Sequence, residues 1–285
     1  MTGHWTTQGD VKGTAEWVAV SESLIGSAHV RNGTPTQDSH RTWSDGSGAV
    51  IAVADGHGYE AHFRSAVGAE VATEIAIELL SKAISELRDA VVTQERLAAV
   101  VGPALVERWT AAVLDHAGEY PFTGAEQPLQ LGGSDSDIVR AYGSTVIAMV
   151  ATGDVLGVLQ LGDGDAVVVR ADGEIFQPLP TDPDLDGTRT TSLCQPDPLR
   201  SLRCVSVDGT TDPIALGFVS TDGFGGPRVD AAGWWKQVGA ELLEHAREQG
   251  FDWIASKLPQ WLEEPAQYGG DDTTLAVLGN LRQLQ

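Results

Sequence analysis

The chain has 285 residues, of which 42% are hydrophobic and 20% are charged, so it can bury a sizeable core and is too apolar for intrinsic disorder. Its net charge of −22 excludes most nucleic-acid and anionic-membrane binding, because an acidic surface repels phosphates, and it favours metal ions or cationic partners. Cys194 and Cys204 match no metal-ligand spacing, and no signal peptide or membrane-spanning run is expected, which predicts a cytoplasmic protein.

The first part of the chain is predicted to pass from strands into two helices. The expected strands span residues 16–20, 24–30 and 49–54, with a polar loop at 32–40. From Tyr59 to about Val91 apolar residues recur every four positions, which is typical of one long amphipathic helix. A second helix with the same spacing is expected from about Gln94 to His116. Since each helix has one apolar face, the pair is predicted to cover a sheet.

The middle of the chain is predicted to be a β meander. Residues 118–142 are rich in glycine and acidic residues and are expected to form a loop. The strands that follow are expected at 144–150, 155–161, 166–170 and 174–177. Their connections are too short for a parallel crossover, so neighbouring strands are predicted to pair antiparallel. Residues 178–201 contain several prolines and aspartates and are predicted to be a flap-like insertion.

The last third is predicted to hold two strands, two helices and a final strand. These elements are expected at 202–207, 214–221, 232–249, 251–263 and 274–278. Helices grouped in pairs between runs of antiparallel strands indicate an α+β protein, an antiparallel β-sandwich flanked by helix pairs in four α-β-β-α layers. No internal repeat or domain boundary is evident, so residues 1–285 are predicted to form a single domain.

Aspartates stand where apolar strands meet loops. They are Asp55, Asp163, Asp222 and Asp271, with Asp38 in the polar loop before strand 49–54. A single aspartate of this kind is usually a turn residue. Several at equivalent strand ends are expected to converge on one pocket, where they would repel one another unless a cation neutralised them. An all-oxygen set of this kind suits Mg²⁺ or Mn²⁺.

The stretch Asp55-Gly56-His57-Gly58 adds an imidazole to this predicted site. Gly56 has no side chain, so its backbone can approach a metal closely enough for the carbonyl to bind. His57 has an ordinary pKa near neutrality and can protonate a leaving oxygen while a metal-activated hydroxide attacks. Catalysis is therefore expected to depend on Asp55 and His57.

The same residues occur in a recognisable order of motifs. They are TQDSH at 36–40, VADGHG at 53–58, GST at 143–145, LGDGD at 161–165, STDGF at 220–224 and GGDDTT at 269–274. Over nearly its whole length the chain resembles the metal-dependent protein phosphatases of type 2C, in their bacterial branch. The resemblance implies an antiparallel β-sandwich flanked by helix pairs, two Mn²⁺ or Mg²⁺ ions with a third in many bacterial members, and hydrolysis of phosphoserine and phosphothreonine. The implied partner is a phosphorylated protein, such as the target of a cognate serine/threonine kinase.

The resemblance also implies roles for individual residues. Its metal ligands would be Asp38, Asp55, Asp222, Asp271 and the Gly56 carbonyl, with Asp163 joining Asp222 at a third ion, and His57 would be the general acid. Gly33 stands where many members have a phosphate-binding arginine, so His29 and Arg31 are the candidates to contact phosphate. Asp272 replaces the asparagine that usually follows the last aspartate, which leaves open whether Asp271 or Asp272 is the ligand.

Two other functions compete with this prediction. LQLGDGDAVV also fits the motif of haloacid-dehalogenase-like phosphatases, with Asp163 as nucleophile, but that fold needs a parallel sheet, and the strands around Asp163 are close enough to force a hairpin. A catalytically silent module that keeps the fold and binds phosphopeptides would be marked by lost ligands, and none of the principal four is lost. A metal-dependent phosphatase is the predicted function.

Overall fold

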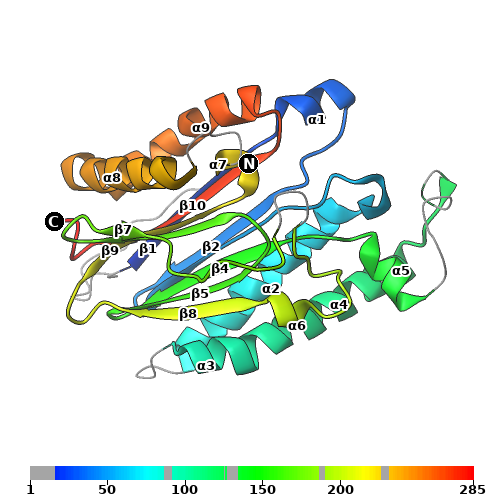
Figure 1. Cartoon of the computed structure of the whole chain (residues 1–285), viewed down its shortest axis with the longest axis horizontal. Coiled ribbons are helices and arrows are strands. Elements are labelled where there is room, and N and C mark those ends of the chain that lie inside the picture. The colour runs from blue at the N-terminus through cyan, green and yellow to red at the C-terminus, as the bar shows by residue number, and fades with distance from the viewer. Residues whose placement is uncertain (1–16, 87–91, 125, 127–133, 186–189, 226–230) are drawn as a thin grey trace.

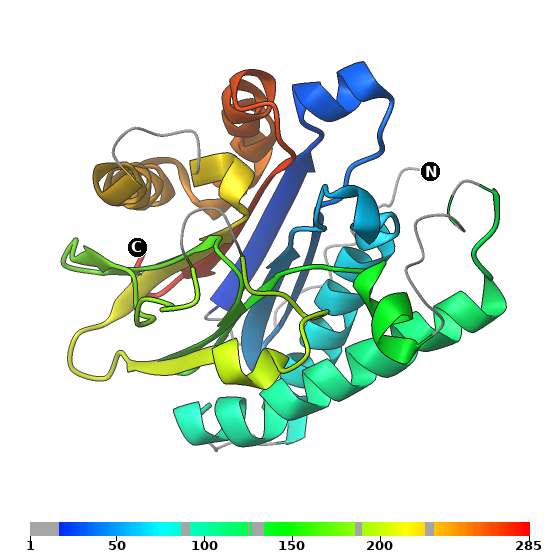
Figure 2. The ribbon, with the colours of Figure 1, turned by 45° about the vertical axis from the view of Figure 1, so that its right-hand side comes forward.

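The computed structural model describes residues 17–86, 92–124, 126, 134–185, 190–225 and 231–285. These residues form four layers, a helix pair, two stacked sheets and a second helix pair, as Figures 1 and 2 show from two sides. Every pairing between the described strands is antiparallel. The predicted α+β sandwich is therefore confirmed, and the parallel sheet needed by a haloacid-dehalogenase fold is not found in the described strands.

The two sheets have five strands each. Sheet I runs in the order β2 (Ser39–Asp45), β3 (Gly48–Ala54), β4 (Val146–Thr152), β5 (Val155–Leu161) and β8 (Arg203–Asp208). Sheet II runs in the order β1 (Trp17–Leu24), β10 (Thr273–Asn280), β9 (Ile214–Ser220), β6 (Asp165–Arg170) and β7 (Ile175–Phe176). Sheet I is covered by α2 (Ser65–Glu86) and α4 (Gly102–Glu119), and sheet II by α8 (Ala231–Gln249) and α9 (Phe251–Tyr268).

The layers enclose three apolar cores, which explains why the central strands are apolar throughout. In β3 the odd-numbered residues from Ala49 to Val53 pack between the sheets, and the even-numbered ones from Val50 to Ala54 pack under α2. Successive side chains of a strand point to opposite faces, so a strand buried on both faces shows no polar alternation. The third core lies between sheet II and the α8/α9 pair.

The N-terminal prediction is wrong in two places. Residues 24–30 do not form a strand, because β1 ends at Leu24 and α1 (Ser27–Asn32) follows, closed by Gly33 with a left-handed φ of 67°. The polar segment β2 was not predicted at all. It is the edge strand of sheet I, and its polar side chains are compatible with an edge that faces solvent on one side.

The predicted meander is wrong at the turn that carries Asp163. β5 belongs to sheet I and β6 to sheet II, so the turn Gly162–Gly164 does not close a hairpin. Instead it carries the chain across the sandwich, with φ of 119° at Gly162. Spacing limits a short connection to nearby strands but does not say in which sheet they lie. The insertion 178–201, whose residues 186–189 lie outside the described part, returns the chain from β7 to β8 in sheet I.

The helices agree with the predicted periodicity, with different ends. The first long helix begins at Ser65, after the short turn η1 (Glu60–His62), and its predicted end at 87–91 lies outside the described residues. The second runs through α3 (Gln94–Arg96) and a π-helical turn, η2 (Leu97–Val101), before α4. Pro103, near the start of α4, has no backbone N–H, so it cannot donate the hydrogen bond of a regular α-helical turn where the π-helical turn ends. Two short helices, α5 (Asp135–Arg140) and α6 (Pro198–Ser201), lie in predicted irregular segments.

The helical run Gln94–Glu119 is also long and apolar enough by composition to cross a membrane. This is weak evidence, because a core helix of a folded protein passes the same test. Here Leu105, Trp109 and Val113 are buried in the core under sheet I.

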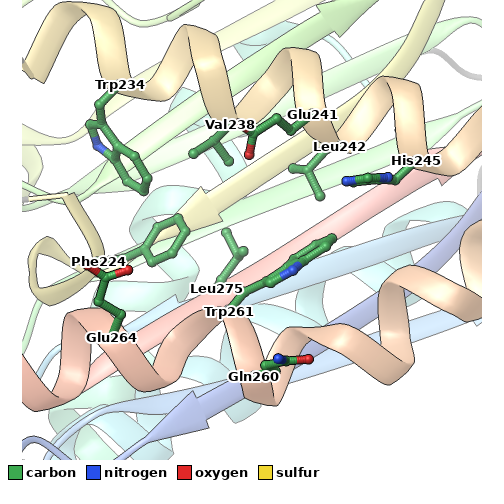
Figure 3. A pocket seen from close by; sticks show the side chains of 10 residues that line it. All are labelled: Phe224, Trp234, Val238, Glu241, Leu242, His245, Gln260, Trp261, Glu264 and Leu275. Carbon is green, nitrogen blue, oxygen red and sulfur yellow. The ribbon is translucent and has the colours of Figure 1, made fainter.

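A cavity of about 310 Å³ lies in the outer layer between α8 and α9 (Figure 3). Its walls include the rings of Phe224, Trp234 and Trp261, and the two tryptophans pack against the core between sheet II and the α8/α9 pair. Phe224 belongs to α7 (Asp222–Gly225), whose first residue is a predicted metal ligand. The α8/α9 layer thus packs against the element that carries Asp222.

Candidate metal centre

The predicted ligands gather at one rim of the sandwich. Asp55 follows β3, Asp163 lies between β5 and β6, Asp222 follows β9, and Asp271 precedes β10. In antiparallel sheets the end of one strand lies beside the start of its neighbour, so these positions meet at the same rim. The strand pairing therefore brings together aspartates that are far apart in the sequence.

A cavity of about 610 Å³ opens at this rim, and all four of these carboxylates line it. The backbone of Gly56 and the ring of His57 line the same cavity. Asp38 does not line it but lies next to it, where its carboxylate accepts hydrogen bonds from Thr221 (2.7 Å) and Thr274 (2.6 Å). The structure therefore brings the predicted metal-binding residues together.

The carboxylates are electrostatically coupled. Burial, together with the charges of Asp272 and Asp271, raises the pKa of Asp38 to about 8, although the Thr274 and Thr221 hydroxyls lower it. Burial and the charge of Asp163 are the largest causes that raise the pKa of Asp222 to about 6. Asp55 has a pKa well above its ordinary value, first from burial and then from the neighbouring Asp38, Asp222, Asp271 and Asp163. A cluster with pKa values raised in this way lacks a counter-charge.

The donor set fits a hard divalent cation. Its atoms are carboxylate oxygens and a backbone carbonyl, which Mg²⁺ and Mn²⁺ prefer. Within the described ranges, no three histidine, cysteine, aspartate or glutamate side chains stand close enough to cage one ion. Such a loose arrangement suits an ion that keeps several waters and takes only one or two carboxylates directly.

The coupled carboxyls predict how metal-free stability depends on pH. A carboxyl with a higher pKa in the folded protein binds more protons when folded, so stability falls as pH rises between its unfolded and folded pKa values. For Asp38 this pH window runs from about 4 to about 8. For Asp222 it runs from about 4 to about 6. We therefore expect the unfolding temperature in EDTA to fall from pH 5 to pH 8, and the fall to be smaller with Mn²⁺ or in the Asp38→Asn variant. Equal slopes in all three samples would contradict the assignment.

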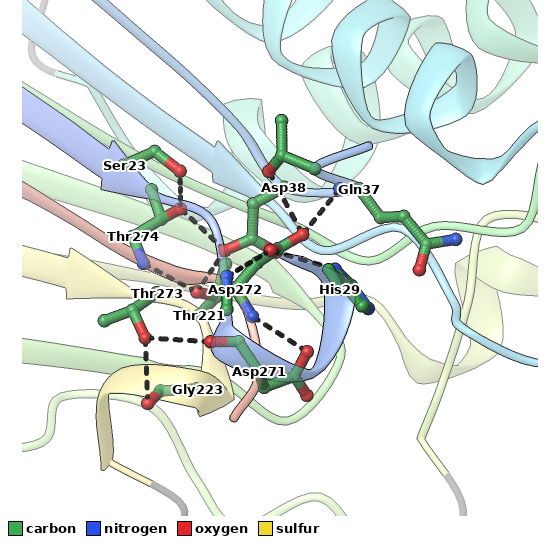
Figure 4. A network of polar contacts seen from close by, with 12 residues as sticks. Ser23, His29, Gln37, Asp38, Thr221, Gly223, Asp271, Asp272, Thr273 and Thr274 are labelled. Atoms are coloured by element: carbon green, nitrogen blue, oxygen red, sulfur yellow. Dashed lines mark hydrogen bonds and ion pairs between the residues drawn. The ribbon is translucent and has the colours of Figure 1, made fainter. Parts of the chain in front are cut away.

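Asp272 is held in a hydrogen-bond network that separates it from the cavity (Figure 4). Its buried carboxylate accepts hydrogen bonds from Gly26 N (2.8 Å), Thr36 Oγ1 (3.0 Å) and Gln37 N (2.6 Å). It also pairs with His29 Nδ1 at 2.9 Å. These contacts join α1, the loop before β2 and the start of β10. Asp271, by contrast, is exposed at the cavity, so the geometry favours Asp271 over Asp272 as the ligand.

The two candidate phosphate-binding residues differ in position. His29 lines the cavity, with its Nδ1 held by Asp272. Arg31 does not line it, because its guanidinium donates a hydrogen bond to Ser27 Oγ (3.0 Å) on the exposed side of α1. Among the described residues that line the cavity there is no lysine or arginine, so its basic side chains are three histidines, His29, His57 and His62.

The ring of His57 is held on three sides. Its Nε2 lies 2.7 Å from Ser192 Oγ, and the ring of His62 packs edge-on with its centroid 5.0 Å away. A Cβ atom on Gly143 would lie 2.8 Å from His57 Cδ2 and 2.4 Å from His62 Nδ1, which gives the glycine of the GST motif a steric reason. Burial, and then the nearby His62, lower the pKa of His57 to about 4. The imidazole is therefore neutral in the free protein at neutral pH.

Some residues at the cavity were not predicted as part of the site. They are Tyr59, His62, Thr190, Ser192 and Cys194. Thr190 donates a hydrogen bond to Asp163 (2.7 Å), and Ser192 contacts His57 from 135 positions away. Only Tyr59 and His62, which follow the DGHG motif closely, offered a signal, because no spacing rule connects residue 192 with residue 57.

Comparisons with known proteins identify the family and the fold. The model of the family described as protein phosphatase 2C matches residues 25–263. No curated protein matches the chain. One similar solved structure is the catalytic domain of the serine threonine protein phosphatase PstP in complex with two manganese ions, at 19% identity and a TM-score of 0.52, with 92% of this chain and 97% of that chain covered.

Two further structures have the same fold. Stp1 from Staphylococcus aureus is 14% identical with a TM-score of 0.57, and the match covers 98% of this chain and 99% of that one. The serine/threonine phosphatase of S. agalactiae is 15% identical with a TM-score of 0.56, over 92% of this chain and 99% of that one. At these identities the likeness concerns the fold.

Proposed function

Because the chain belongs to the protein phosphatase 2C family, and so to the metal-dependent serine/threonine phosphatases, we propose that it hydrolyses phosphoserine and phosphothreonine on proteins in the rim cavity. One observation carries the proposal: Asp55, Asp163, Asp222 and Asp271, which come from distant parts of the chain, line the same cavity. A binding module would have no need for this concentration of carboxylates.

In this proposal the aspartates hold two Mn²⁺ or Mg²⁺ ions. The ligands are Asp38, Asp55, Asp222, Asp271 and the Gly56 carbonyl, and Asp163 with Asp222 would hold a third ion. When bound, the ions would lower the pKa of a water molecule and offset the negative charge on the phosphoryl oxygens. The hydrogen bonds from Thr221 and Thr274 keep one oxygen of Asp38 in place for this task.

The histidines act on the phosphate and on the leaving group. His29 is the proposed contact for a phosphate oxygen, because it lines the cavity and Asp272 fixes its ring. His57 is the proposed general acid. Its neutral state in the free protein fits this role if the substrate supplies the missing charge, since a phosphate dianion beside the ring raises the pKa of the imidazole. The protonated ring then donates its proton to the oxygen of the leaving serine or threonine.

Metal removal tests the proposed function. With Mn²⁺ we expect hydrolysis of p-nitrophenyl phosphate and of a phosphothreonine peptide, and EDTA is expected to lower both rates by about a hundredfold or more, because the ions supply the nucleophile and neutralise charge. Excess Mn²⁺ or Mg²⁺ should restore activity, which controls for unfolding by the chelator. Activity that survives EDTA would contradict the proposal. No turnover together with tight phosphopeptide binding would instead indicate a silent binding module.

A further inference from the structure

The insertion 178–201 sends one segment back into the catalytic rim. Leu193 N donates a hydrogen bond to Ser144 O (2.9 Å), which ties the segment to the GST motif. On the same stretch, the hydroxyl of Ser192 lies 2.7 Å from His57 Nε2, and Ser192 is only 6% exposed. The contact between the insertion and the catalytic imidazole is thus a buried one.

The hydrogen bonds of Ser192 favour one direction for this contact. A serine hydroxyl has one proton to donate and two lone pairs that accept. Ser192 Oγ lies 3.1 Å from Ser144 O, which can only accept, and it receives the N–H of Cys194 at 3.3 Å. It also lies 3.2 Å from Cys194 Sγ, but a thiol is a weak donor and a weak acceptor, so this contact competes poorly with the other partners. With the proton directed to Ser144 O and one lone pair taken by Cys194 N–H, the remaining lone pair accepts a proton from His57 Nε2. In this arrangement the ring nitrogen that faces Ser192 is the donor.

We infer that Ser192 is a positioning residue for the general acid: it fixes His57 as the Nε2–H form and leaves Nδ1 as the atom that transfers the proton. His57 lines the cavity, and Nδ1 makes no hydrogen bond to the described residues, so it is available to a substrate there. Gly143 and His62 prevent the ring from turning over. This inference rests on the proposed function.

The water oxygen forms a bond to phosphorus and its two protons stay on the product, which leaves as dihydrogen phosphate. The bond from phosphorus to the serine or threonine oxygen breaks with its electron pair left on that oxygen. The Nδ1–H bond of the protonated His57 breaks, and the proton forms an O–H bond on the leaving oxygen. The product imidazole is neutral and still donates its Nε2–H to Ser192. The ring takes up a proton again from solvent before the next turnover.

The first test compares leaving groups. A p-nitrophenolate leaves without protonation, whereas the alkoxide of threonine needs a proton. In Ser192→Ala we expect the kcat for a phosphothreonine peptide to fall about tenfold more than the kcat for p-nitrophenyl phosphate, with little change in the peptide KM, since a general acid contributes about a hundredfold or more when fully placed. Ser201→Ala is the matched control. Ser201 lies in the same insertion with the same 6% exposure and bonds to Asp184 and Gln195 instead.

The second test observes the ring itself. In the Mg²⁺-loaded protein, ¹⁵N spectra of the histidine side chains, with His57→Ala to assign the signals, should show His57 protonated on Nε2, and Ser192→Ala should add a population protonated on Nδ1. A wild-type ring protonated on Nδ1, or equal losses for both substrates in Ser192→Ala, would overturn the inference. His57→Ala separates the two proposals: if it loses peptide activity selectively while Ser192→Ala does not, only the inference about Ser192 fails. If the wild type shows no metal-dependent turnover, the proposed function fails.

Discussion

Asp55→Asn is expected to lower metal-dependent phosphatase activity by about a thousandfold or more, because a ligand and a full charge are lost at the point where the carboxylates converge. The metal-free variant should also unfold at a higher temperature than the metal-free wild type. Burial, followed by the charges of Asp38, Asp222, Asp271 and Asp163, makes an ionised Asp55 costly in the absence of metal. The measurements are the rate with Mn²⁺, Mn²⁺ binding by calorimetry, and thermal unfolding in EDTA.

Asp172→Asn provides the matched control. Asp172 also precedes a glycine, but its side chain accepts a hydrogen bond from Glu174 N in an exposed turn far from the cavity residues in the fold. This variant should keep the activity and the Mn²⁺ affinity of the wild type. If Asp55→Asn retained more than about a tenth of the activity, the aspartates would not be the catalytic metal ligands.

Asp271→Ala and Asp272→Ala are expected to separate metal binding from folding. Asp272 is 2% exposed and accepts hydrogen bonds from two backbone N–H groups, Gly26 N and Gln37 N, which its removal leaves buried without a partner (Figure 4). Because each unsatisfied group costs about 1–3 kcal/mol, we expect Asp272→Ala to lose about 3 kcal/mol or more of unfolding free energy. Asp271→Ala should lose less stability, because only the N–H of Asp272 donates to its carboxylate (2.9 Å), and it should abolish metal-dependent activity.

For Asp271→Ala and Asp272→Ala, the free energy of unfolding is measured by urea unfolding in EDTA, and metal affinity by Mn²⁺ titration. A stable Asp271→Ala protein that no longer binds Mn²⁺ normally would agree with Asp271 as the ligand. The opposite pattern, with Asp272→Ala stable and unable to bind metal, would reverse the assignment. Asp272→Asn is a second probe in case the alanine variant does not fold, because the amide keeps one acceptor oxygen but directs an N–H₂ group at the donors around it.

The sequence predicted those features that depend on regular spacing. Apolar residues at every fourth position between Tyr59 and His116 predicted the helices over sheet I, and the buried strand before Asp55 was recognised from its unbroken apolar run. The aspartates were found because each stands at the end of such a strand. These patterns are local in the sequence, so they can be recognised without knowing which helices and strands contact one another in the fold.

The errors fall where distant contacts override local preference. Residues 27–32 form α1 rather than a strand, and the helix is tied to the start of β10 through Ala28 N to Gly270 O (2.9 Å) and through the carboxylate of Asp272. The turn at Asp163 joins two sheets rather than two neighbours in one sheet. Hydrophobic periodicity describes one element at a time, so it cannot register a bond between residues more than two hundred positions apart.

By itself the sequence determined the residue types and their order, which were enough to indicate an antiparallel sandwich, a carboxylate site for hard cations and an imidazole beside it. Only the tertiary structure decided which of the adjacent carboxylates, Asp271 or Asp272, faces the cavity. It also decided that Arg31 stays outside the cavity and that Ser192 reaches His57. The physical reason is that a hydrogen bond or a charge pair acts over a few ångströms in space, and only folding brings such distant positions that close.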